Sequence, residues 1–340
     1  VLLAALIYIP ANVTYQIGEN FLASFLPGVS TPRTIGRISA LGWAMGYAGA
    51  LVLLVISIGL MLTMGWESPA MWRPFFIFAG VWFAINMIPA LLCLHEPPID
   101  RSVRQASNSQ SLLVDAIARL RNTIASAKQY RQLGRFFLAF FIFGMGVQVI
   151  IAFASILASD FGITGTGLVI YVGQITITAG LAAVVTGLYQ DRLGARTTVI
   201  VFLVVWVASA LALLAISLLP TKPQWAFWLV GNGLGIGIGG IGTASRSLVG
   251  RFTPAHKTAE FFGLWGMVYK AAGVAGVASF GQVKAWIGMP ASLGLLSMFF
   301  VVGLVLLLRV NETAGLRAAR RTERDAIKGH GPPSASAEQS

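Results

Sequence analysis

The stretch GLYQDRLGAR at residues 187–196 displays the pattern that recurs along this chain of 340 residues, in which a short charged segment separates long apolar runs. It places charged side chains and one glycine, Gly194, between apolar runs near 166–188 and 197–219. Each run is long enough to cross a hydrocarbon core of roughly 30 Å as a helix, which takes about 20 mostly apolar residues. Gly194 permits a tight turn because glycine has no Cβ. The stretch therefore predicts a very short charged hairpin between two membrane-spanning helices.

Apolar runs of this length recur along the whole chain, and the composition agrees with them. Hydrophobic residues make up 56% of the chain and charged residues 11%, whereas soluble globular proteins carry about 25% charged residues. A soluble fold of this size has no interior large enough for so much apolar surface. We therefore predict an all-α integral membrane bundle with nine transmembrane helices. The runs lie near 1–26, 39–64, 71–94, 135–158, 166–188, 197–219, 225–247, 260–283 and 288–308.

A polar central segment divides these spans unevenly, with three before it and six after it. We predict a first helical part over 1–94, a cytoplasmic central loop over 95–134, a six-helix part over 135–309 and a disordered cytoplasmic tail over 310–340. Within the loop, apolar residues recur at helical spacing over 113–124 between basic ones. This pattern predicts an amphipathic helix at the membrane interface, and a plain solvated linker is the alternative.

The basic residues predict how the bundle is oriented. When successive loops are assigned to alternate sides, 20 of the 24 Lys and Arg residues fall on one side and three on the other. Lys and Arg collect in cytoplasmic loops, so the basic side is predicted to be cytoplasmic. We expect a multi-pass protein of the cell membrane, in contact with the lipid bilayer, whose C-terminus is cytoplasmic. The net charge of +12 then records orientation and does not indicate a nucleic-acid partner.

Two charged residues inside spans are the first candidates for a substrate or coupling site, because an intramembrane charge is costly unless it is paired or hydrated. Lys270 lies ten residues beyond Glu260, which is about 15 Å along a helix and near the bilayer midplane. It is a candidate to bind a substrate carboxylate or exchange a proton, with a structural partner for a carboxylate or helix carbonyls as the alternative. Glu19 is a candidate proton-coupling site or the partner of Lys270, and a neutral buried Glu is the alternative.

Isolated amide side chains are the second set of candidates. They occur singly in otherwise apolar spans, where they can line a polar cavity for a small solute or form hydrogen bonds between helices. The sequence does not decide between these two interpretations. The residues concerned are Gln148, Gln174, Asn86 and Asn232.

The predicted hairpin itself is a candidate for conformational gating. Asp191 can accept hydrogen bonds from the N-terminus of a neighbouring helix, where the helix dipole favours an anion, and we expect this helix end near Arg37 and Ser39. Arg192 and Arg196 flank the turn as positive-inside anchors. A charged turn that only sets topology is the alternative.

Arg246 and Glu260 lie at the cytoplasmic ends of consecutive antiparallel spans. We class them with the gating candidates and expect a structural ion pair between them.

Several enzyme classes and binding sites are excluded by the residues that the spans contain. The three His residues lie in loops or in the tail, and no pair of carboxylates occurs within the spans, so intramembrane proteolysis is not indicated. The glycine-rich stretch at 231–240 lacks the preceding strand and the following acidic residue of a dinucleotide site. Its glycines at four-residue spacing predict close helix packing instead. We therefore expect no enzymatic activity, no metal site and no cofactor.

The spacing G-x-x-x-D-R-x-G-x-R at 187–196 resembles the signature hairpin of the major facilitator superfamily. A narrower resemblance rests on Leu26-Pro27 and on residues 36–47, Gly-Arg-Ile-Ser-Ala-Leu-Gly-Trp-Ala-Met-Gly-Tyr. These stretches resemble the "unknown major facilitator" family, whose eukaryotic relatives are the vacuolar amino-acid effluxers of autophagy. Further matches are Gly146-Val147-Gln148, Ser245-Arg246-Ser247-Leu248, Glu260-Phe261-Phe262-Gly263 and Lys270.

One departure from the family pattern concerns the helix that contains Met145. The family commonly carries an Asp at this position, so a role of that carboxylate in relatives cannot be transferred to this chain.

The resemblance implies a bundle of twelve helices in two halves, joined by a long cytoplasmic loop. Nine spans then correspond to helices four to twelve, so the chain is expected to be N-terminally truncated. The implied function is secondary-active transport of small solutes by alternating access, with amino-acid export and proton coupling as the specific expectations, by a monomer. The alternative is a non-transporting membrane protein, either a lipid-handling or scaffold bundle or an inactive truncated paralogue.

Overall fold

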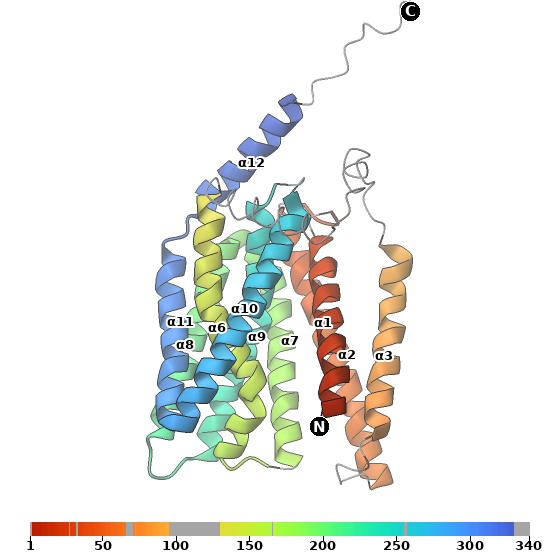
Figure 1. The fold of residues 1–340 in the computed structure, drawn as a ribbon, viewed down its shortest axis with the longest axis vertical. Helices are drawn as coiled ribbons and strands as arrows, with labels where there is room; N and C mark the ends of the chain where they lie inside the picture. The colour runs from red at the N-terminus through yellow and green to blue at the C-terminus, as the bar shows by residue number, and fades with distance from the viewer. Residues whose placement is uncertain are drawn as a thin grey trace, which may run out of the picture. The chain divides into compact units, whose positions relative to one another are not determined.

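The structure is a computed structural model that is all helical over the part of the chain it describes (Figure 1). The central segment, including the predicted amphipathic helix over 113–124, lies outside the described residues. The described residues are 2–26, 28–31, 33–65, 71, 73–94, 130–164, 166–254 and 257–329. The helices are α1 Leu2–Ser24, α2 Ile35–Met64, α3 Arg73–Cys93, α6 Arg131–Asp160, α7 Thr166–Leu193, α8 Ala195–Ser217, α9 Gln224–Phe252, α10 Thr258–Trp286, α11 Met289–Leu308 and α12 Glu312–Gly329.

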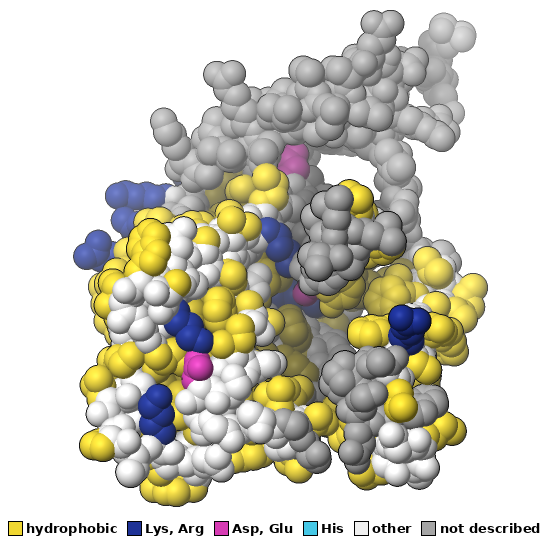
Figure 2. Space-filling view, turned by 60° about the horizontal axis from the view of Figure 1, so that its bottom comes forward, with side chains coloured by type: hydrophobic (Ala, Val, Ile, Leu, Met, Phe, Trp, Pro, Cys, Tyr) yellow, Lys and Arg dark blue, Asp and Glu magenta, His cyan; other side chains and the backbone are white. Residues whose placement is uncertain are grey.

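Eight helices, α2, α3 and α6 to α11, are long and apolar enough to cross a membrane, and they coincide with eight of the nine predicted spans. The ninth, α1, is a helix of 23 residues that carries Glu19 and is not among these eight. Large apolar side chains are exposed along the spans, and Figure 2 shows them spread over the visible surface among few Lys and Arg side chains. Trp286, for example, is 80% exposed. An apolar exterior of this kind suits a lipid environment, so the all-α membrane fold is confirmed.

The chain divides into two compact units. One comprises Val1–Ala44 together with Thr123–Ser340, and the other comprises Met45–Asn122. The first unit therefore contains α1, the first turns of α2 and all helices from α6 onward. Everything described below concerns this unit unless stated otherwise.

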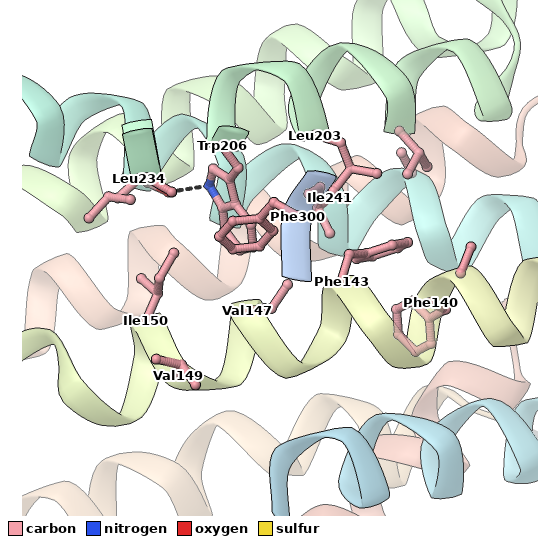
Figure 3. Close-up of a cluster of buried hydrophobic side chains, with 14 of the residues drawn as sticks. Phe140, Phe143, Val147, Val149, Ile150, Leu203, Trp206, Leu234, Ile241 and Phe300 are labelled. Carbon is pink, nitrogen blue, oxygen red and sulfur yellow. Dashed lines mark hydrogen bonds between the residues drawn. The ribbon is translucent and has the colours of Figure 1, made fainter. Parts of the chain in front are cut away.

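Large side chains from α6, α8, α9 and α11 form the core of the first unit. Trp206 of α8 is fully buried and packs edge-to-face against Phe300 of α11, with 4.8 Å between the ring centroids. Its indole Nε1 donates a hydrogen bond to the carbonyl of Leu234 in α9 at 3.1 Å, and Figure 3 shows Phe143 and Val147 of α6 in the same cluster. Helices α6, α8, α9 and α11 are thus joined by one continuous apolar core.

The glycine-rich stretch of α9 packs closely against α7, as its spacing predicts. A Cβ on Gly231 would lie 2.6 Å from the Tyr171 ring, and one on Gly239 would overlap the backbone of Ala179. These positions leave no room for a side chain. Small residues therefore allow the two helix backbones to approach each other.

The expectation of a disordered tail from residue 310 is wrong for α12. Asn311 caps this helix, because its side-chain oxygen accepts hydrogen bonds from the Ala314 N–H at 3.0 Å and the Thr313 hydroxyl at 2.8 Å. Gly315 lies so close to Phe252 of α9 that a Cβ there would overlap the ring. A cap, a helix-favouring composition and this packing together make the segment helical. Residues 330–340 lie outside the described part.

Candidate functional site

The α7–α8 hairpin forms within a single residue. α7 ends at Leu193 and α8 begins at Ala195, so Gly194 alone connects them. Gly194 has a φ of +88°, a conformation that favours glycine, and its N–H donates to the carbonyl of Gln190 at 2.9 Å. The predicted tight turn is confirmed, and it fixes Asp191 in the last turn of α7. We call the end of the bundle that carries residues 191–196 the hairpin end.

Asp191 caps the N-terminus of α2. Its Oδ1 accepts a hydrogen bond from the Gly36 N–H at 3.1 Å, and its Oδ2 accepts one from the Arg37 N–H at 3.0 Å. Amides in the first turn of a helix have no partner within the helix, and the helix dipole favours a carboxylate beside them. A Cβ on Gly36 would lie only 2.5 Å from Asp191 Oδ1, so the contact depends on glycine. This is the geometry expected of Asp191, whereas its role in gating stays a prediction.

A second carboxylate caps the N-terminus of α8 in the same manner. Glu312, the first residue of α12, accepts hydrogen bonds from the Ala195 N–H at 3.1 Å and the Arg196 N–H at 2.9 Å. Arg251, near the end of α9, lies between the two carboxylates. Its Nη2 is 3.0 Å from Asp191 Oδ1, and its Nη1 is 3.0 Å from Glu312 Oε1. We call Asp191, Arg251 and Glu312 the capping network.

All three side chains of the capping network are mostly buried, with exposed fractions of 10% for Arg251, 20% for Asp191 and 15% for Glu312. Sequence reasoning missed Arg251 and Glu312. The available signal was the pair of polar residues Asn311 and Glu312 directly after the last span, where a helix cap and first turn are common.

The first turns of α2 lie between α7 and α9. Ser39 of α2 is 1% exposed, and its hydroxyl donates a hydrogen bond to the carbonyl of Thr243 in α9 at 3.2 Å. A Cβ on Gly187 of α7 would lie 2.8 Å from the Cβ of Ala40. At the hairpin end, α2 therefore contacts α7 and α9 of the six-helix part, and these contacts bring the helix backbones close together.

The other gating candidates have different surroundings. Arg192 is exposed, and Arg196 donates from Nη2 to the carbonyl of Leu308 at the end of α11, at 2.9 Å. Glu260 is exposed in the first turn of α10, and the Glu19 carboxylate acts electrostatically on Arg246. The expected pair between Arg246 and Glu260 stays a prediction.

Charged residues from three helices interact deeper in the bundle. The carboxylate of Glu19 in α1 interacts electrostatically with both Arg246 of α9 and Lys270 of α10. Lys270 is partly buried, and its Nζ lies 5.0 Å from the centroid of the Tyr269 ring. The Glu19 carboxylate therefore acts electrostatically on Lys270 and on Arg246, and the roles expected of Glu19 and Lys270 stay predictions.

The amide candidates divide into two groups by their contacts. Gln148 of α6 packs on α10 opposite Gly273, and a Cβ on Gly273 would lie 3.1 Å from the Gln148 Nε2. Gly273 follows Lys270 by about one helical turn, so Gln148 lies about one turn from Lys270. Gln174 and Asn232 both donate to the carbonyl of Trp228, at 2.9 and 3.4 Å.

In the second unit, the Asn86 side chain donates to the carbonyl of Trp82 at 2.8 Å within α3. Of these three bonds, that of Gln174 joins α7 to α9, whereas those of Asn232 and Asn86 each stay within one helix. The choice between lining a polar cavity and helix packing stays a prediction for all four amides.

No cluster of three or more His, Cys, Asp or Glu side chains able to hold a metal ion occurs within the described ranges.

Comparison with known proteins decides the family. The family described as "Vacuole effluxer Atg22 like" matches residues 30–320 of the chain. The chain belongs to this family. Its members are transporters of the major facilitator type, so the resemblance seen in the sequence motifs is confirmed.

Individual relatives are distant and longer than this chain. An uncharacterized MFS-type transporter of Bacillus subtilis, YxiO, is 26% identical over 319 residues, which cover 92% of this chain and 72% of the relative. Autophagy-related protein 22 of Yarrowia lipolytica is 25% identical over 291 residues, and autophagy-related protein 22-2 of Aspergillus clavatus is 24% identical over 263 residues. The matches cover 49% and 43% of these fungal proteins, so the chain spans about half their length.

Proposed function

We propose that this Atg22-like chain is a secondary-active transporter that moves small solutes by alternating access. The observation that carries the proposal is the Asp191 carboxylate of α7 capping the N-terminus of α2. Hydrogen bonds to two backbone amides hold α2 against the six-helix part, yet they can break and reform without refolding either helix. A reversible latch of this kind is what alternating access needs at one end of the bundle.

The proposed latch is cytoplasmic in our assignment of the topology. The hairpin end carries Arg37, Arg192, Arg196 and Arg251, and the sequence count places 20 of 24 basic residues on this side. The positive-inside tendency then orients it toward the cytoplasm. In this proposal, contacts between Asp191 and α2 belong to a state whose cytoplasmic end is closed.

Glu19, Lys270 and Arg246 are the proposed solute and coupling site. Two cations and one carboxylate leave the group with a net positive charge, which favours a solute that carries an acidic group. In this proposal a solute carboxylate competes with Glu19 for Lys270, and Glu19 is the residue that couples solute binding to the proton. Gln148, one turn from Lys270, supplies a polar group beside this site. Amino acids are the proposed solute class, by analogy with the family.

The test is a flux measurement in liposomes that contain the purified full-length protein and a trapped pH dye. We expect amino acids to drive a proton flux, and we expect Lys270→Ala and Glu19→Gln to abolish it. Lys284→Ala is the matched control, because this lysine pairs with Asp160 away from the proposed site. Normal flux with Lys270→Ala removes Lys270 from the site. No solute-dependent flux with any variant or with the unaltered chain favours the non-transporting alternative.

A further inference from the structure

A polar cavity lies at the hairpin end between α12, the end of α9 and the linker that joins α1 to α2. Its volume is about 200 Å³, whereas a single water needs only roughly 10–15 Å³ of such space. The cavity is therefore large enough for a small organic molecule. The polar side chains that line it are those of Ser30, Thr31, Arg251, Thr253, Arg320 and Glu323.

One group of these side chains accepts hydrogen bonds. The Ser30 hydroxyl donates to the carbonyl of Leu26 at 2.5 Å, and the Thr253 hydroxyl donates to the carbonyl of Val249 at 2.8 Å. A hydroxyl has one proton and two lone pairs, so both oxygens keep lone pairs for a ligand. Glu323 of α12 adds a carboxylate, which only accepts hydrogen bonds when it is ionised. This set of acceptors suits an ammonium group, which has three N–H donors.

A second group donates hydrogen bonds. Arg320 precedes Glu323 by about one turn of α12, yet the two form no ion pair with each other in the described part of the chain. The two terminal nitrogens of Arg251 bind carboxylates, whereas its buried Nε makes no hydrogen bond within the described ranges. A buried N–H without a partner is costly, so an acceptor beside it is favourable. These guanidinium groups suit a carboxylate.

We propose that this cavity binds a small zwitterion that carries both an ammonium and a carboxylate group, the chemistry of a free amino acid. The ammonium faces Glu323 and the hydroxyl oxygens, and the carboxylate faces Arg320. The bound molecule joins α12 to the linker, since Glu323 belongs to the first and Ser30 to the second. Lys270 does not line this cavity, so the inference concerns a second site and does not depend on the proposed function.

The experiment uses valine as the probe and a cysteine in the linker as the reporter. Thr31 lines the cavity and is exposed, so Thr31→Cys in a Cys93→Ser background of the purified full-length protein should react readily with a membrane-impermeant maleimide. We expect valine to slow this reaction, because the bound molecule covers the cysteine. Arg317→Cys, at an exposed position of α12 that does not line the cavity, is the control reporter and should react equally with and without valine.

Two analogues of valine that each lack one charged group test the zwitterion. Isovalerate keeps the carboxylate and the branched carbon chain, and isobutylamine keeps the ammonium and the same branch. Each analogue leaves one of the two groups of lining side chains without its ligand. We expect neither to protect Thr31→Cys at the concentration where valine gives half of its full protection.

Substitutions on α12 test whether the ligand contacts the wall opposite the reporter. Glu323→Gln and Arg320→Gln should each raise the valine concentration for half protection about tenfold, as expected for the loss of one charge-assisted hydrogen bond. Arg321→Gln removes a charge from an exposed position outside the cavity and should leave this concentration unchanged. Lys270→Ala should leave it unchanged too, because Lys270 belongs to the other site.

Several outcomes would overturn the inference. Protection by isovalerate equal to that by valine would make the cavity an anion site, and equal protection by isobutylamine would make it a cation site. Protection that disappears in Lys270→Ala would assign the effect to the proposed solute site. Absence of protection by valine also overturns the inference, whereas the proposed function stands or falls separately with the solute-dependent flux in liposomes.

Discussion

The two ends of the six-helix part use charged residues differently. At the hairpin end, Asp191 and Ser39 connect α2 to α7 and α9, so contacts cross from the N-terminal helices to the C-terminal ones. At the opposite end, Lys284 of α10 pairs with Asp160 of α6 at 2.5 Å, which joins two helices of the same part. The first arrangement can open a path between helix groups, whereas the second can only stiffen one group. The difference identifies the hairpin end as the candidate gate.

The largest expected effect comes from neutralising Asp191 at the hairpin end, with Asp160 at the opposite end as the matched comparison. A cysteine at position 39, introduced as Ser39→Cys in a Cys93→Ser background, is buried against α9, so its reaction rate with a membrane-impermeant maleimide reports separation of α2 from α9. Asp191→Asn should raise this labelling rate about tenfold, since a charge-assisted hydrogen bond contributes roughly 1.5–3 kcal/mol and about 1.4 kcal/mol corresponds to tenfold. Asp160→Asn is matched in chemistry and also removes an ion pair, yet it should leave labelling unchanged. Equal labelling of the two variants would mean that Asp191 controls opening of the bundle no more than Asp160 does.

A smaller effect is expected from crowding the latch without changing its charge. Gly36→Ala places a methyl group 2.5 Å from Asp191 Oδ1 and 2.9 Å from Gln190 Nε2, so the carboxylate must move. We expect labelling to rise about fivefold, corresponding to roughly 1 kcal/mol. Gly42→Ala lies on the same helix with nothing within 4 Å of its Cβ and serves as the control. If both alanines behave alike, close packing at Gly36 does not matter for closure.

A substitution in the apolar core should lower the free energy of unfolding without changing the labelling of Ser39→Cys. Trp206→Phe removes the hydrogen bond to Leu234 and some buried volume, so the free energy of unfolding should fall by about 1–2 kcal/mol. Trp225→Phe, at a position 71% exposed, should change it little. Thermal unfolding in detergent measures both. Faster labelling of Ser39→Cys in the Trp206 variant would mean that opening reflects loosening of the whole bundle.

The smallest expected effect concerns the pair at the opposite end. Lys284 and Asp160 are 25% and 35% exposed, and exposed ion pairs contribute only about 0–1 kcal/mol. Lys284→Gln should therefore shift the unfolding midpoint by no more than a degree or two in the same assay. A large loss of stability would show that this pair stabilises the six-helix part more than its exposure suggests.

Much of the fold was predictable because each helix is encoded locally. Runs of spanning length predicted the helices, and the glycines at 231, 235 and 239 predicted the close approach of α9 to α7. The turn at Gly194 and the docking of Asp191 near Arg37 followed from the chemistry of a helix N-terminus. The helices and the turn are encoded by neighbouring residues, whereas the helix packing and the docking of Asp191 each follow from one general rule about small residues or helix N-termini.

The remainder depended on contacts between distant residues. Nothing near Arg251 in the sequence indicates that it lies between Asp191 and Glu312, which are 60 and 61 residues away. The helix α12 was missed because its charged composition suggested a solvated tail, while its stability comes from Asn311 and from packing on Phe252. The electrostatic influence of Glu19 on Arg246 likewise links residues from distant parts of the chain.

A reversible cross-link at the hairpin end tests the central claim most directly. A Cβ on Gly187 would lie 2.8 Å from that of Ala40, and a shift of about 1 Å gives the separation of roughly 3.8 Å found in disulfides. Ala40→Cys with Gly187→Cys, in the Cys93→Ser background, should form a disulfide that stops solute flux in liposomes and should regain flux on reduction. Flux through the cross-linked protein at the rate of the reduced one would contradict alternating access through this end.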